Sequence, residues 1–374
     1  MNAPVRPTEV VVDLAAVRHN VATIAAAADT PVCAVVKADA YGHGAVPVAR
    51  ACVEAGAAWL AVALVEEAEE LRAGGVDHPL LLFSEPPVAG TGRLLAAGVT
   101  PPLYTAEFAH ALDAAGRERG RPVDVHLCVD TGMGRVGVPH GELPAFLDVL
   151  AGLDHVRVDG LWTHLARADE PALPTTDEQL DRFDVARQQV ADAGHAPTWT
   201  HAANTAGALL HPRARHDLVR PGIGVYGLSP ATEVPASEHG LRPALALRTE
   251  VRFAKRVAAG TPISYGHRWS APADGWVATL QLGYADGVPR LLTNRLDAVH
   301  AGVRRPVVGT VTMDQVHLWC GDDEPVVGDE VHLLGGPAGG PAVAVEEWAD
   351  TLGTITYEVT CGLGARLPRR HLHA

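Results

Sequence analysis

Lys37 is the residue in this chain with the clearest capacity for chemistry. It directly follows Val32–Val36, an apolar, β-branched run typical of a strand buried on both faces. An ammonium group at the end of such a strand either extends to solvent or has a chemical partner. A lysine amine can form an imine with the carbonyl of pyridoxal phosphate, and Gly42 and Gly44 would let the backbone approach a bulky cofactor. A surface lysine at a strand end is the alternative that this segment leaves open.

Two polar loops further along the chain could hold a phosphate group. Asn204 and Thr205 bring a side-chain amide and a hydroxyl, and Gly222 and Ile223 bring backbone amides. Amides and hydroxyls that point into a common loop form a concavity that binds anions. An ordinary polar loop beside a Pro-Gly turn is the alternative interpretation.

The elements that would position these residues alternate regularly from Val10 to about Leu228. Short β-branched runs alternate with alanine-rich amphipathic segments, a pattern typical of βα units around a parallel sheet. Strands are predicted over Val32–Val36, Trp59–Val62, Leu80–Phe83, Val123–Val129, Val156–Trp162, Thr198–His201 and Ile223–Tyr226. Helices are predicted over Leu14–Ala28, after the N-cap residue Asp13, and over Ala106–Ala115 and Asp177–Ala193.

About eight such units in about 220 residues favour a (β/α)8 barrel of the TIM type over an open doubly wound sheet. No Gly-x-Gly-x-x-Gly sequence opens the first unit, which weakens the dinucleotide-binding alternative. In a (β/α)8 barrel the active site lies at the C-terminal ends of the strands, and phosphate is commonly held after the last two. With Thr198–His201 and His216–Val219 taken as those strands, the two polar loops fall at the phosphate position.

A second, mostly β domain is predicted after Leu228. Beyond a linker from Ser229 to Gly240, alternating strands are separated by turns such as Asp274-Gly275, with one helix over Val345–Leu352. We therefore predict an α/β protein with a barrel over residues 10–232 and a β domain over residues 240–374, on which residues 1–9 are expected to pack.

Composition argues against several classes of partner. The formal net charge of -14 argues against nucleic acid and anionic membrane surfaces, which bind clustered lysine and arginine. No segment reaches the ~20 apolar residues of a membrane span, and Met1–Val12 lacks the apolar core of an export signal. The 5 cysteines and 19 histidines show no metal-ligand spacing. A cytoplasmic protein without a metal, acting on a small molecule, is predicted.

A series of short motifs along nearly the whole chain resembles those of bacterial alanine racemases. The motifs are Val35–Gly44 (VVKADAYGHG), Asp130–Arg135, Thr163-His164, His201–Asn204, Arg220–Ile223, Ser264–Gly266, Gly283–Gly287, Thr312–Gln315 and Tyr357-Glu358. The resemblance implies an isomerase dependent on pyridoxal phosphate, with a (β/α)8 barrel and a C-terminal β domain. It also implies a homodimer with shared active sites that interconverts L-alanine and D-alanine in D-alanine biosynthesis.

The resemblance also implies roles for the cofactor-binding residues. Lys37 would carry the cofactor as an aldimine, and its phosphate would be surrounded by Tyr41, Asn204, Thr205, Gly222, Ile223 and Tyr357. Thr205 stands where the family usually has serine, so the hydroxyl is kept. Arg220 would donate to the pyridine nitrogen without protonating it, because an arginine practically never loses its proton. A weakly delocalised carbanion then favours simple reprotonation. A surface arginine before a turn is the alternative.

Racemisation requires two acid/base groups on opposite faces of the substrate Cα. The resemblance assigns these roles to Lys37 and to Tyr265, the latter from the other subunit of a head-to-tail homodimer. Lowering a tyrosine pKa of ~10 by about three units requires roughly 4 kcal/mol of anion stabilisation. His164, hydrogen-bonded toward Arg220, is the implied source of positive charge, so the three side chains would form one relay. A buried strand tyrosine and a satisfied core histidine are the alternatives.

The substrate carboxylate would be held by Arg135 and by the main chain near Met313, the arginine through bidentate pairing. Here the sequence departs from the family pattern, because Cys128 stands where many members have a carbamylated lysine that orients this arginine. A bound anion such as chloride would replace the missing charge, or Arg135 would be held less firmly. Thr310, where the family often has arginine, is a second departure.

Three other functions remain to be distinguished from alanine racemisation. The first is racemisation of another small amino acid, serine above all. The second is decarboxylation on the same fold type, against which Arg220 argues because decarboxylases depend on a protonated ring nitrogen. The third is a non-catalytic carrier of pyridoxal phosphate. Such a carrier resembles the barrel alone, so a β domain bearing Tyr265 and Tyr357 argues against it.

Overall fold

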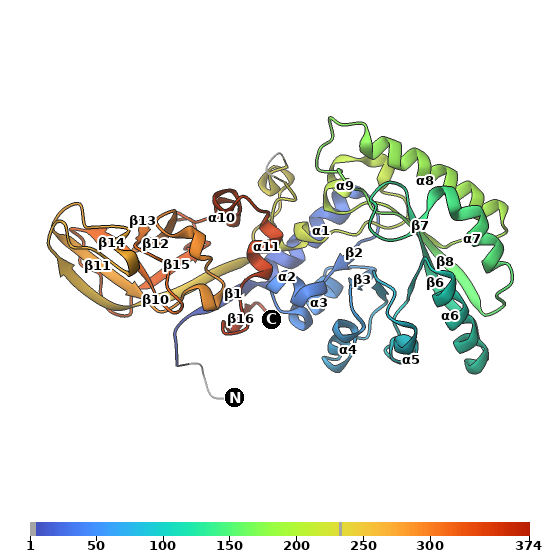
Figure 1. Cartoon of the computed structure of the whole chain (residues 1–374), viewed down its shortest axis with the longest axis horizontal. Coiled ribbons are helices and arrows are strands. Elements are labelled where there is room, and N and C mark those ends of the chain that lie inside the picture. Colours follow the sequence, from blue (N-terminus) through green and yellow to red (C-terminus); the bar gives the residue numbers. More distant parts are fainter. Residues whose placement is uncertain (1–4, 232–233) are drawn as a thin grey trace. The chain divides into compact units, whose positions relative to one another are not determined.

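The computed structural model describes residues 5–231 and 234–374, which form two compact units (Figure 1). The α/β unit comprises Val17–Ala40 and Ala45–Arg242. The β unit comprises the residues up to Ala16, together with Tyr41–Gly44 and Pro243–Ala374. Residue 232, the predicted end of the barrel, and residues 1–4 lie outside the described part of the chain.

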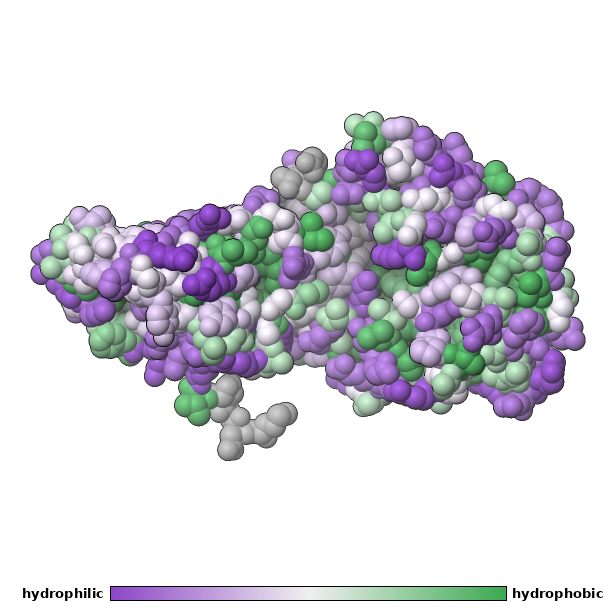
Figure 2. Space-filling view, in the orientation of Figure 1, coloured by the Kyte–Doolittle hydropathy of each residue, from purple (hydrophilic) through white to green (hydrophobic). Residues whose placement is uncertain are grey.

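The formal net charge of the chain is -14. Figure 2 shows hydrophilic residues over much of the visible face of each unit, with hydrophobic residues scattered among them. Among the described helices, none is long and apolar enough to cross a membrane.

The α/β unit is built on two parallel sheets. The first contains β2 (Cys33–Val35), β3 (Trp59–Val62) and β4 (Leu80–Leu82), in that order. The second contains β5 (Pro102–Leu103), β6 (Val123–Asp130), β8 (Val156–Trp162) and β9 (Trp199–His201), with β7 (Val138–Pro139) beside β6. Every residue of β2, β4 and β5 is buried, as expected for strands covered on both faces.

Backbone pairings connect the two sheets at both ends. Leu81 of β4 forms a parallel bridge with Thr100, just before β5. On the other side, the Asp217 amide donates to the Thr200 carbonyl of β9 at 3.0 Å, and Val219 forms a parallel bridge with Val32, just before β2. The segment 217–221 therefore lies beside both β9 and β2.

The helices of the α/β unit follow its strands along the chain (Figure 1). They are α1 (Leu14–Ala28), α2 (Lys37–Gly42), α3 (Ala45–Glu54), α4 (Val65–Ala73), α5 (Thr91–Ala96), α6 (Ala106–Arg119), α7 (Leu143–Leu150), α8 (Thr175–Asp192) and α9 (Thr205–Leu210). The predicted cap of α1 is confirmed, because Asp13 Oδ1 accepts a hydrogen bond from the Ala15 amide at 2.9 Å.

The β unit contains a closed antiparallel barrel of six strands. They are β10 (Leu245–Val257), β11 (Gly275–Leu280), β12 (Leu296–His300), β13 (Val303–Val308), β14 (Val316–Gly321) and β15 (Glu330–Leu334). Their order is β11-β14-β13-β12-β15-β10, and β10 pairs with β11 to close the ring. Closure leaves these strands without free edges. Outside the ring, β1 (Glu9–Asp13) pairs with β10, and β16 (Arg369–Leu372) pairs with β1.

The helices of the β unit are short. Two are α-helices, α10 (Val345–Leu352), as predicted, and α11 (Thr356–Cys361). The 3-10 helices of the described chain are η1 (Val88–Gly90), η2 (His140–Glu142), η3 (Pro212–Ala214), η4 (Ile223–Tyr226), η5 (Ala236–His239), η6 (Tyr265–His267), η7 (Tyr284–Asp286) and η8 (Arg290–Leu292).

Three of the sequence predictions differ from the structure. The strand predicted over His216–Val219 is reduced to an isolated bridge between Val219 and Val32. The strand predicted over Ile223–Tyr226 is wrong, because these residues form η4, in which the Tyr226 hydroxyl donates to the Val35 carbonyl at 2.8 Å. Gly222, Gly224 and Gly227 punctuate this segment and favour a turn over an extended strand. Val10 was placed in the barrel by the sequence pattern, but it lies in β1, whose pairing partners β10 and β16 belong to the β unit.

The predicted α/β class with a second β domain is confirmed.

Candidate active site

Lys37 is the first residue of α2 and follows the buried strand β2 after a single residue. That residue, Val36, donates its amide to the Ala61 carbonyl of β3 at 2.9 Å, so the main chain is fixed up to the lysine. The Lys37 side chain is partly buried. The prediction that this lysine lies at a strand's end is confirmed.

The backbone after Lys37 turns in the left-handed sense. Ala38, Asp39, Ala40 and Tyr41 all have φ between 52° and 55°. Left-handed helical backbone costs an L-residue with a Cβ atom roughly 1–2 kcal/mol. Four such residues in succession therefore require support from their surroundings. The left-handed turn could not be predicted from these residue types, since alanine and tyrosine rarely adopt this conformation.

Hydrogen bonds hold this left-handed turn within the α/β unit. The Ala38 amide donates to Glu67 Oε1 at 2.7 Å, and Asp39 Oδ1 accepts from the Ala45 amide at 2.7 Å. Glu67 is itself fixed, because its Oε2 accepts from the Ala63 amide at 2.8 Å. These contacts orient the main chain on which Lys37 stands.

The β unit holds the end of the same turn. The Gly42 carbonyl accepts a hydrogen bond from Arg369 Nε at 3.1 Å, and the His43 carbonyl lies 2.8 Å from His371 Nε2. Gly42 must be glycine, because its φ is 82° and a Cβ atom would lie 2.3 Å from the Thr360 carbonyl oxygen.

Arg220 is a buried cation with neutral neighbours, only 2% exposed. Its guanidinium donates hydrogen bonds to the Thr163 carbonyl at 2.8 Å, the Ala202 carbonyl at 3.1 Å, His201 Nδ1 at 2.7 Å and, more weakly, His164 Nδ1 at 3.4 Å. Its Cζ atom lies 5.1 Å from the centroid of the Trp162 ring. Among the described residues, no carboxylate forms a salt bridge with it. Burial lowers the pKa of Arg220 to about 10, so the guanidinium stays charged at neutral pH.

His164 is held in its neutral form. Burial lowers its pKa well below the ordinary value, and the positive charges of Arg220, Arg135 and Lys37 lower it further. The implied role of His164 as a source of positive charge stays a prediction, and the charged group next to it in this structure is Arg220. The same effect shows that the structure brings these three cations near one histidine.

The predicted phosphate loops lie side by side. The Thr205 hydroxyl oxygen accepts hydrogen bonds from the Gly222 amide at 3.1 Å and from the Gly224 amide at 3.2 Å. Asn204 is the N-cap of α9, and its Oδ1 accepts from the Gly207 amide at 2.9 Å. A Cβ atom on Gly224 would lie 2.7 Å from the Thr205 methyl group, so glycine is required there as well. Ile223, between these two glycines, is the first residue of η4.

Arg135 stands on a loop that is fixed from within. Asp130 Oδ1 accepts from the amides of Gly132 and Met133, each at 2.9 Å. Arg135 itself is exposed, and its guanidinium makes no hydrogen bond or ion pair with the described residues. Cys128 is 2% exposed, and burial raises the pKa of its thiol, so it offers Arg135 no negative charge.

Tyr265 and Met313 lie in the β unit, where both are exposed, at 74% and 52%. They line one open cavity of about 970 Å³. Tyr265 begins η6 and its carbonyl accepts from Thr310 Oγ1 at 2.6 Å, so Thr310 positions the tyrosine main chain. The alternative of a buried strand tyrosine is wrong for Tyr265.

Tyr41 and Tyr357 also meet in the β unit. Their ring centroids are 5.8 Å apart and the ring planes are tilted by 48°. Tyr41 is 7% exposed and belongs to the left-handed turn, and Tyr357 belongs to α11. The structure therefore pairs the two tyrosines that the resemblance implies for the phosphate.

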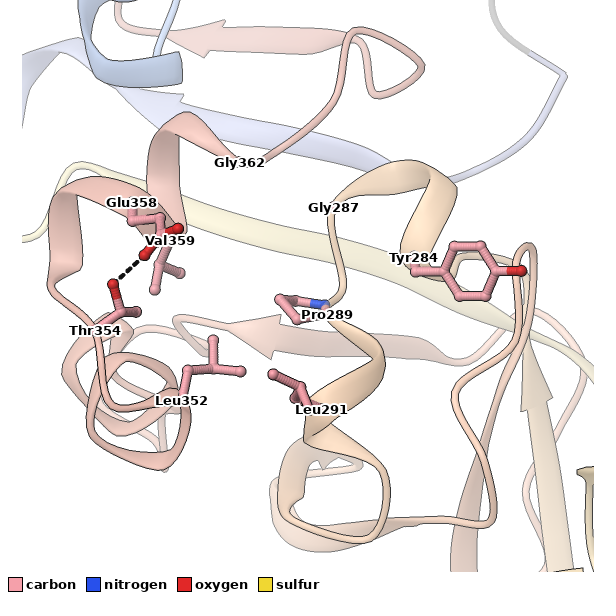
Figure 3. Close-up of a pocket in the computed structure, with 9 residues that line it drawn as sticks. All are labelled: Tyr284, Gly287, Pro289, Leu291, Leu352, Thr354, Glu358, Val359 and Gly362. Carbon is pink, nitrogen blue, oxygen red and sulfur yellow. Dashed lines mark hydrogen bonds between the residues drawn. The ribbon is translucent and has the colours of Figure 1, made fainter. Parts of the chain in front are cut away.

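A smaller cavity of about 330 Å³ lies between α11 and the segment from η7 to η8 (Figure 3). Leu291 and Leu352 face one another across it, and Thr354 is hydrogen-bonded to Glu358 at its rim. Tyr284 lines this cavity and the larger one. None of the predicted site residues lines the smaller cavity, so it offers no candidate for the chemistry.

Sequence reasoning missed two buried histidines next to Arg220. His201 accepts the shortest hydrogen bond of Arg220, and His126 Nδ1 lies 2.9 Å from His201 Nε2. Both are fully buried. Their meeting depends on the sheet order β6-β8-β9, which places His126 and His201 on strands either side of β8. No short motif carries that information.

Comparison with known proteins identifies the family. Models of the N-terminal and C-terminal domains of alanine racemase match residues 12–230 and 244–371. The alanine racemase of Symbiobacterium thermophilum is 47% identical over 366 residues, covering 97% of each chain. That of Frankia casuarinae is 45% identical, covering 97% of this chain and 95% of its own. A solved alanine racemase of Streptomyces coelicolor A3(2) superposes with a TM-score of 0.94 at 36% identity, covering 99% of each chain. The chain therefore belongs to the alanine racemase family.

Proposed function

We propose that this chain interconverts L-alanine and D-alanine with pyridoxal phosphate, the cofactor of its family. The observation that carries the proposal is the convergence of Lys37, Arg135 and Arg220 on His164, in a part of the α/β unit where no described carboxylate pairs with Arg220. A buried cation such as Arg220, which has no described carboxylate partner, favours a ligand that brings its own anionic groups.

The residues present fit pyridoxal phosphate and an amino acid. Lys37 offers the amine that anchors the cofactor, and Arg220 has an Nε–H that finds no acceptor among the described residues. Asn204, Thr205, Gly222 and Ile223 would hold the phosphate, together with Tyr41 and Tyr357. In this structure the Thr205 hydroxyl oxygen accepts a hydrogen bond from the Gly222 amide, which fixes the loop. The hydroxyl proton of Thr205 would then be available to donate a hydrogen bond to the phosphate.

The chemistry that pyridoxal phosphate supplies when bound is electron withdrawal from the amino acid Cα, which weakens its C–H bond. Lys37 would take the proton from one face of Cα and Tyr265 would return one to the other face, with the roles exchanged for the reverse direction. Arg220 can only donate hydrogen bonds, so a ring nitrogen facing it stays unprotonated. This limits charge delocalisation and favours reprotonation over transamination.

Arg135 and the main chain near Met313 would bind the substrate carboxylate. Arg135 has no protein partner among the described residues that would compete for its guanidinium, but it also has none that orients it. A neutral Cys128 beneath the loop leaves the orientation to the substrate or to a bound anion. We expect weaker substrate binding than in relatives with an anionic support for this arginine.

We also propose that two chains form a homodimer with shared active sites, so that Tyr265 of one chain serves Lys37 of the other. The exposed Tyr265 and Met313 support this proposal, because they line one open cavity together and grouped apolar side chains on a surface mark interaction sites. For the fold, the ring of parallel pairings from β2 round to the segment 217–221 supports a (β/α)8 barrel within the α/β unit, Val17–Ala40 and Ala45–Arg242, followed by the β domain from Pro243. None of the five cysteines, all of them described, forms a disulfide, which supports a cytoplasmic location.

The proposal is tested by incubating the protein, loaded with pyridoxal phosphate, with L-alanine or L-serine in deuterium oxide. We expect loss of optical rotation together with deuterium at Cα for alanine. Faster exchange with serine would reassign the substrate within the same chemistry. No exchange with any amino acid would contradict the racemase assignment and favour a non-catalytic carrier.

A further inference from the structure

Three buried side chains of the α/β unit, Arg220, His201 and His126, are connected in a row by hydrogen bonds, and we call this row the file. Arg220 Nη1 lies 2.7 Å from His201 Nδ1, and His201 Nε2 lies 2.9 Å from His126 Nδ1. None of the three side chains is more than 2% exposed. The proposed reaction uses Arg220 but assigns nothing to His126, which lies at the far end.

The chemistry of arginine sets the direction of every hydrogen bond in this file. A guanidinium has only donors, so His201 Nδ1 must be the acceptor and cannot carry a proton. A neutral imidazole has one N–H, so the proton of His201 is on Nε2 and is donated to His126. His126 Nδ1 is then an acceptor as well, and its own proton is on Nε2. The file therefore has one allowed arrangement of protons while both histidines are neutral.

The far end of the file is unsatisfied. His126 Nε2 is buried and has no hydrogen-bond partner among the described residues. A buried donor without an acceptor loses its hydrogen bonds to water without replacement, so it destabilises the folded chain. The Trp59 ring, with its centroid 5.3 Å from that of His126, offers at most a weak aromatic contact. An apolar side chain at position 126 would avoid this cost.

The sheet is shaped to admit the His126 ring. The pairing of β6 with β8 shifts register between Val125 and His126, a bulge that redirects the side chain. Opposite it stands Gly160, where a Cβ atom would lie 2.3–2.6 Å from atoms of the His126 ring. Two backbone features thus make room for a histidine that destabilises the core.

We propose that His126 is a positioning residue for the reaction, acting through His201 to hold Arg220 in one orientation. As the acceptor at the end of the file, it keeps His201 in the tautomer with its proton on Nε2. The other tautomer would turn an N–H of His201 toward the N–H groups of Arg220, and the guanidinium would lose its shortest hydrogen bond. Arg220 would then be free to rotate between the Thr163 and Ala202 carbonyls. The value of this orientation for racemisation rests on the proposed function, but the tautomer itself does not.

The test is the ¹⁵N NMR spectrum of histidine-labelled full-length protein, recorded with and without pyridoxal phosphate. Imidazole ¹⁵N shifts distinguish the two neutral tautomers from the imidazolium form. For the wild-type protein at neutral pH we expect an unprotonated Nδ1 and a protonated Nε2 at both His201 and His126. An imidazolium at either residue, or a His201 proton on Nδ1, would overturn the proposal without any variant having to fold.

Variants then test the role of His126. His126→Leu removes the acceptor, and we expect His201 to populate both tautomers and kcat/KM to fall about 10-fold, mainly through kcat. His126→Asn keeps an acceptor oxygen near the position of Nδ1 and should restore the single tautomer and most of kcat. His300→Leu is the matched control: His300 is a buried histidine of the β unit, 3% exposed, and its loss should lower stability without altering the His201 signal.

The outcomes separate the positioning proposal from the function proposal. If His126→Leu leaves both the His201 tautomer and kcat unchanged, the positioning role is refuted while racemisation stands. If the wild-type protein shows the expected tautomers but no deuterium exchange with any amino acid, the hydrogen-bond arrangement of the file is confirmed and the racemase assignment fails. Should His126→Leu not fold, Gly160→Ala displaces the same ring and is read by the same spectrum.

Discussion

Several predicted site residues of the α/β unit are buried, whereas Tyr265 and Met313 of the β unit are exposed. In the α/β unit, Arg220 and Thr205 are each 2% exposed and are fixed by several hydrogen bonds. In the β unit, Tyr265 is 74% exposed and Met313 is 52% exposed. The first set is organised by its own fold. The second set lines an open cavity of the β unit and is exposed to solvent.

The main chain beside the two proposed bases is alike in the two units, and the enclosure of their side chains differs. Lys37 stands before four residues in left-handed conformation, held by Glu67 and Asp39. Tyr265 follows Ser264, whose φ is 64° and whose hydroxyl donates to the Thr310 carbonyl at 2.7 Å. Both bases therefore sit beside strained backbone. Only the side chain of Lys37 is partly enclosed by its own unit.

The largest effect is expected from Lys37→Ala. The chain has only two lysines, Lys37 and Lys255, so the amine cannot be replaced from nearby in the sequence. We expect racemisation to fall at least about 1000-fold, because both the anchor and one base are lost. Borohydride treatment of the loaded wild-type protein, followed by peptide mapping, should place the pyridoxyl group on Lys37. Lys255→Ala is the matched control, and a label on Lys255 would contradict the assignment.

The comparison of the two units is sharpened by Tyr265→Phe and Arg220→Met. We expect both to lower kcat by about 100-fold or more. Tyr265→Phe should leave the free energy of unfolding within about 0.5 kcal/mol, because the hydroxyl is on an exposed side chain. Arg220→Met should change it measurably in urea titration, since it removes a buried charge and leaves the acceptors of Thr163, Ala202 and His201 unpaired. Equal effects on stability would contradict the contrast drawn between the units.

A smaller effect is expected at Cys128. Cys128→Lys, supplied with bicarbonate, should take up carbon dioxide and lower the KM for alanine severalfold, because a carbamate would orient Arg135. Cys128→Ala is the control for the loss of the thiol, and it should leave KM unchanged. Kinetics that do not depend on bicarbonate would count against a missing anion beneath Arg135.

The last prediction concerns the pH dependence of stability. Burial lowers the pKa of His126 to about 3, and burial also lowers the pKa values of His164 and His201. The unfolded chain therefore binds more protons than the folded chain below about pH 6.5, so stability is lost as the pH falls from 6.5 toward 3. Each histidine contributes about 1.4 kcal/mol per pH unit. Urea titrations at pH 7 and pH 5 measure this loss of stability. The His126→Leu variant should lose the part of the pH dependence that His126 contributes. An unchanged slope would contradict a neutral His126.

Much of the fold could be predicted from sequence because its signals are local. Hydrophobic periodicity and an N-cap aspartate fixed α1 to the residue, and β3 and β8 were predicted with the bounds that the structure has. The strand predicted over Ile223–Tyr226 failed because β-branched residues alternate there with glycines, and the hydrogen bond from Tyr226 to Val35 decides the conformation. That contact joins residues far apart in the chain.

Some residues of the site could be predicted from sequence, because their residue type allows only a few chemical roles. Lys37 and Arg220 could be singled out from the charge they carry and the strands before them. The file from Arg220 to His126 could not, because it depends on the order of three strands and on a bulge. The charge state of His164 also depends on burial and on cations brought from other loops.

The central claim is that the site combines the buried half from one chain with the exposed half from another, and it is tested by mixing two inactive variants. Lys37→Ala and Tyr265→Phe proteins, each inactive alone, are unfolded together, refolded in equal amounts and assayed for alanine racemisation. If the sites are shared, half of the dimers are mixed and each has one intact site, so about a quarter of the wild-type activity should return. If both bases come from the same chain, no mixture recovers activity, and that result would contradict the account.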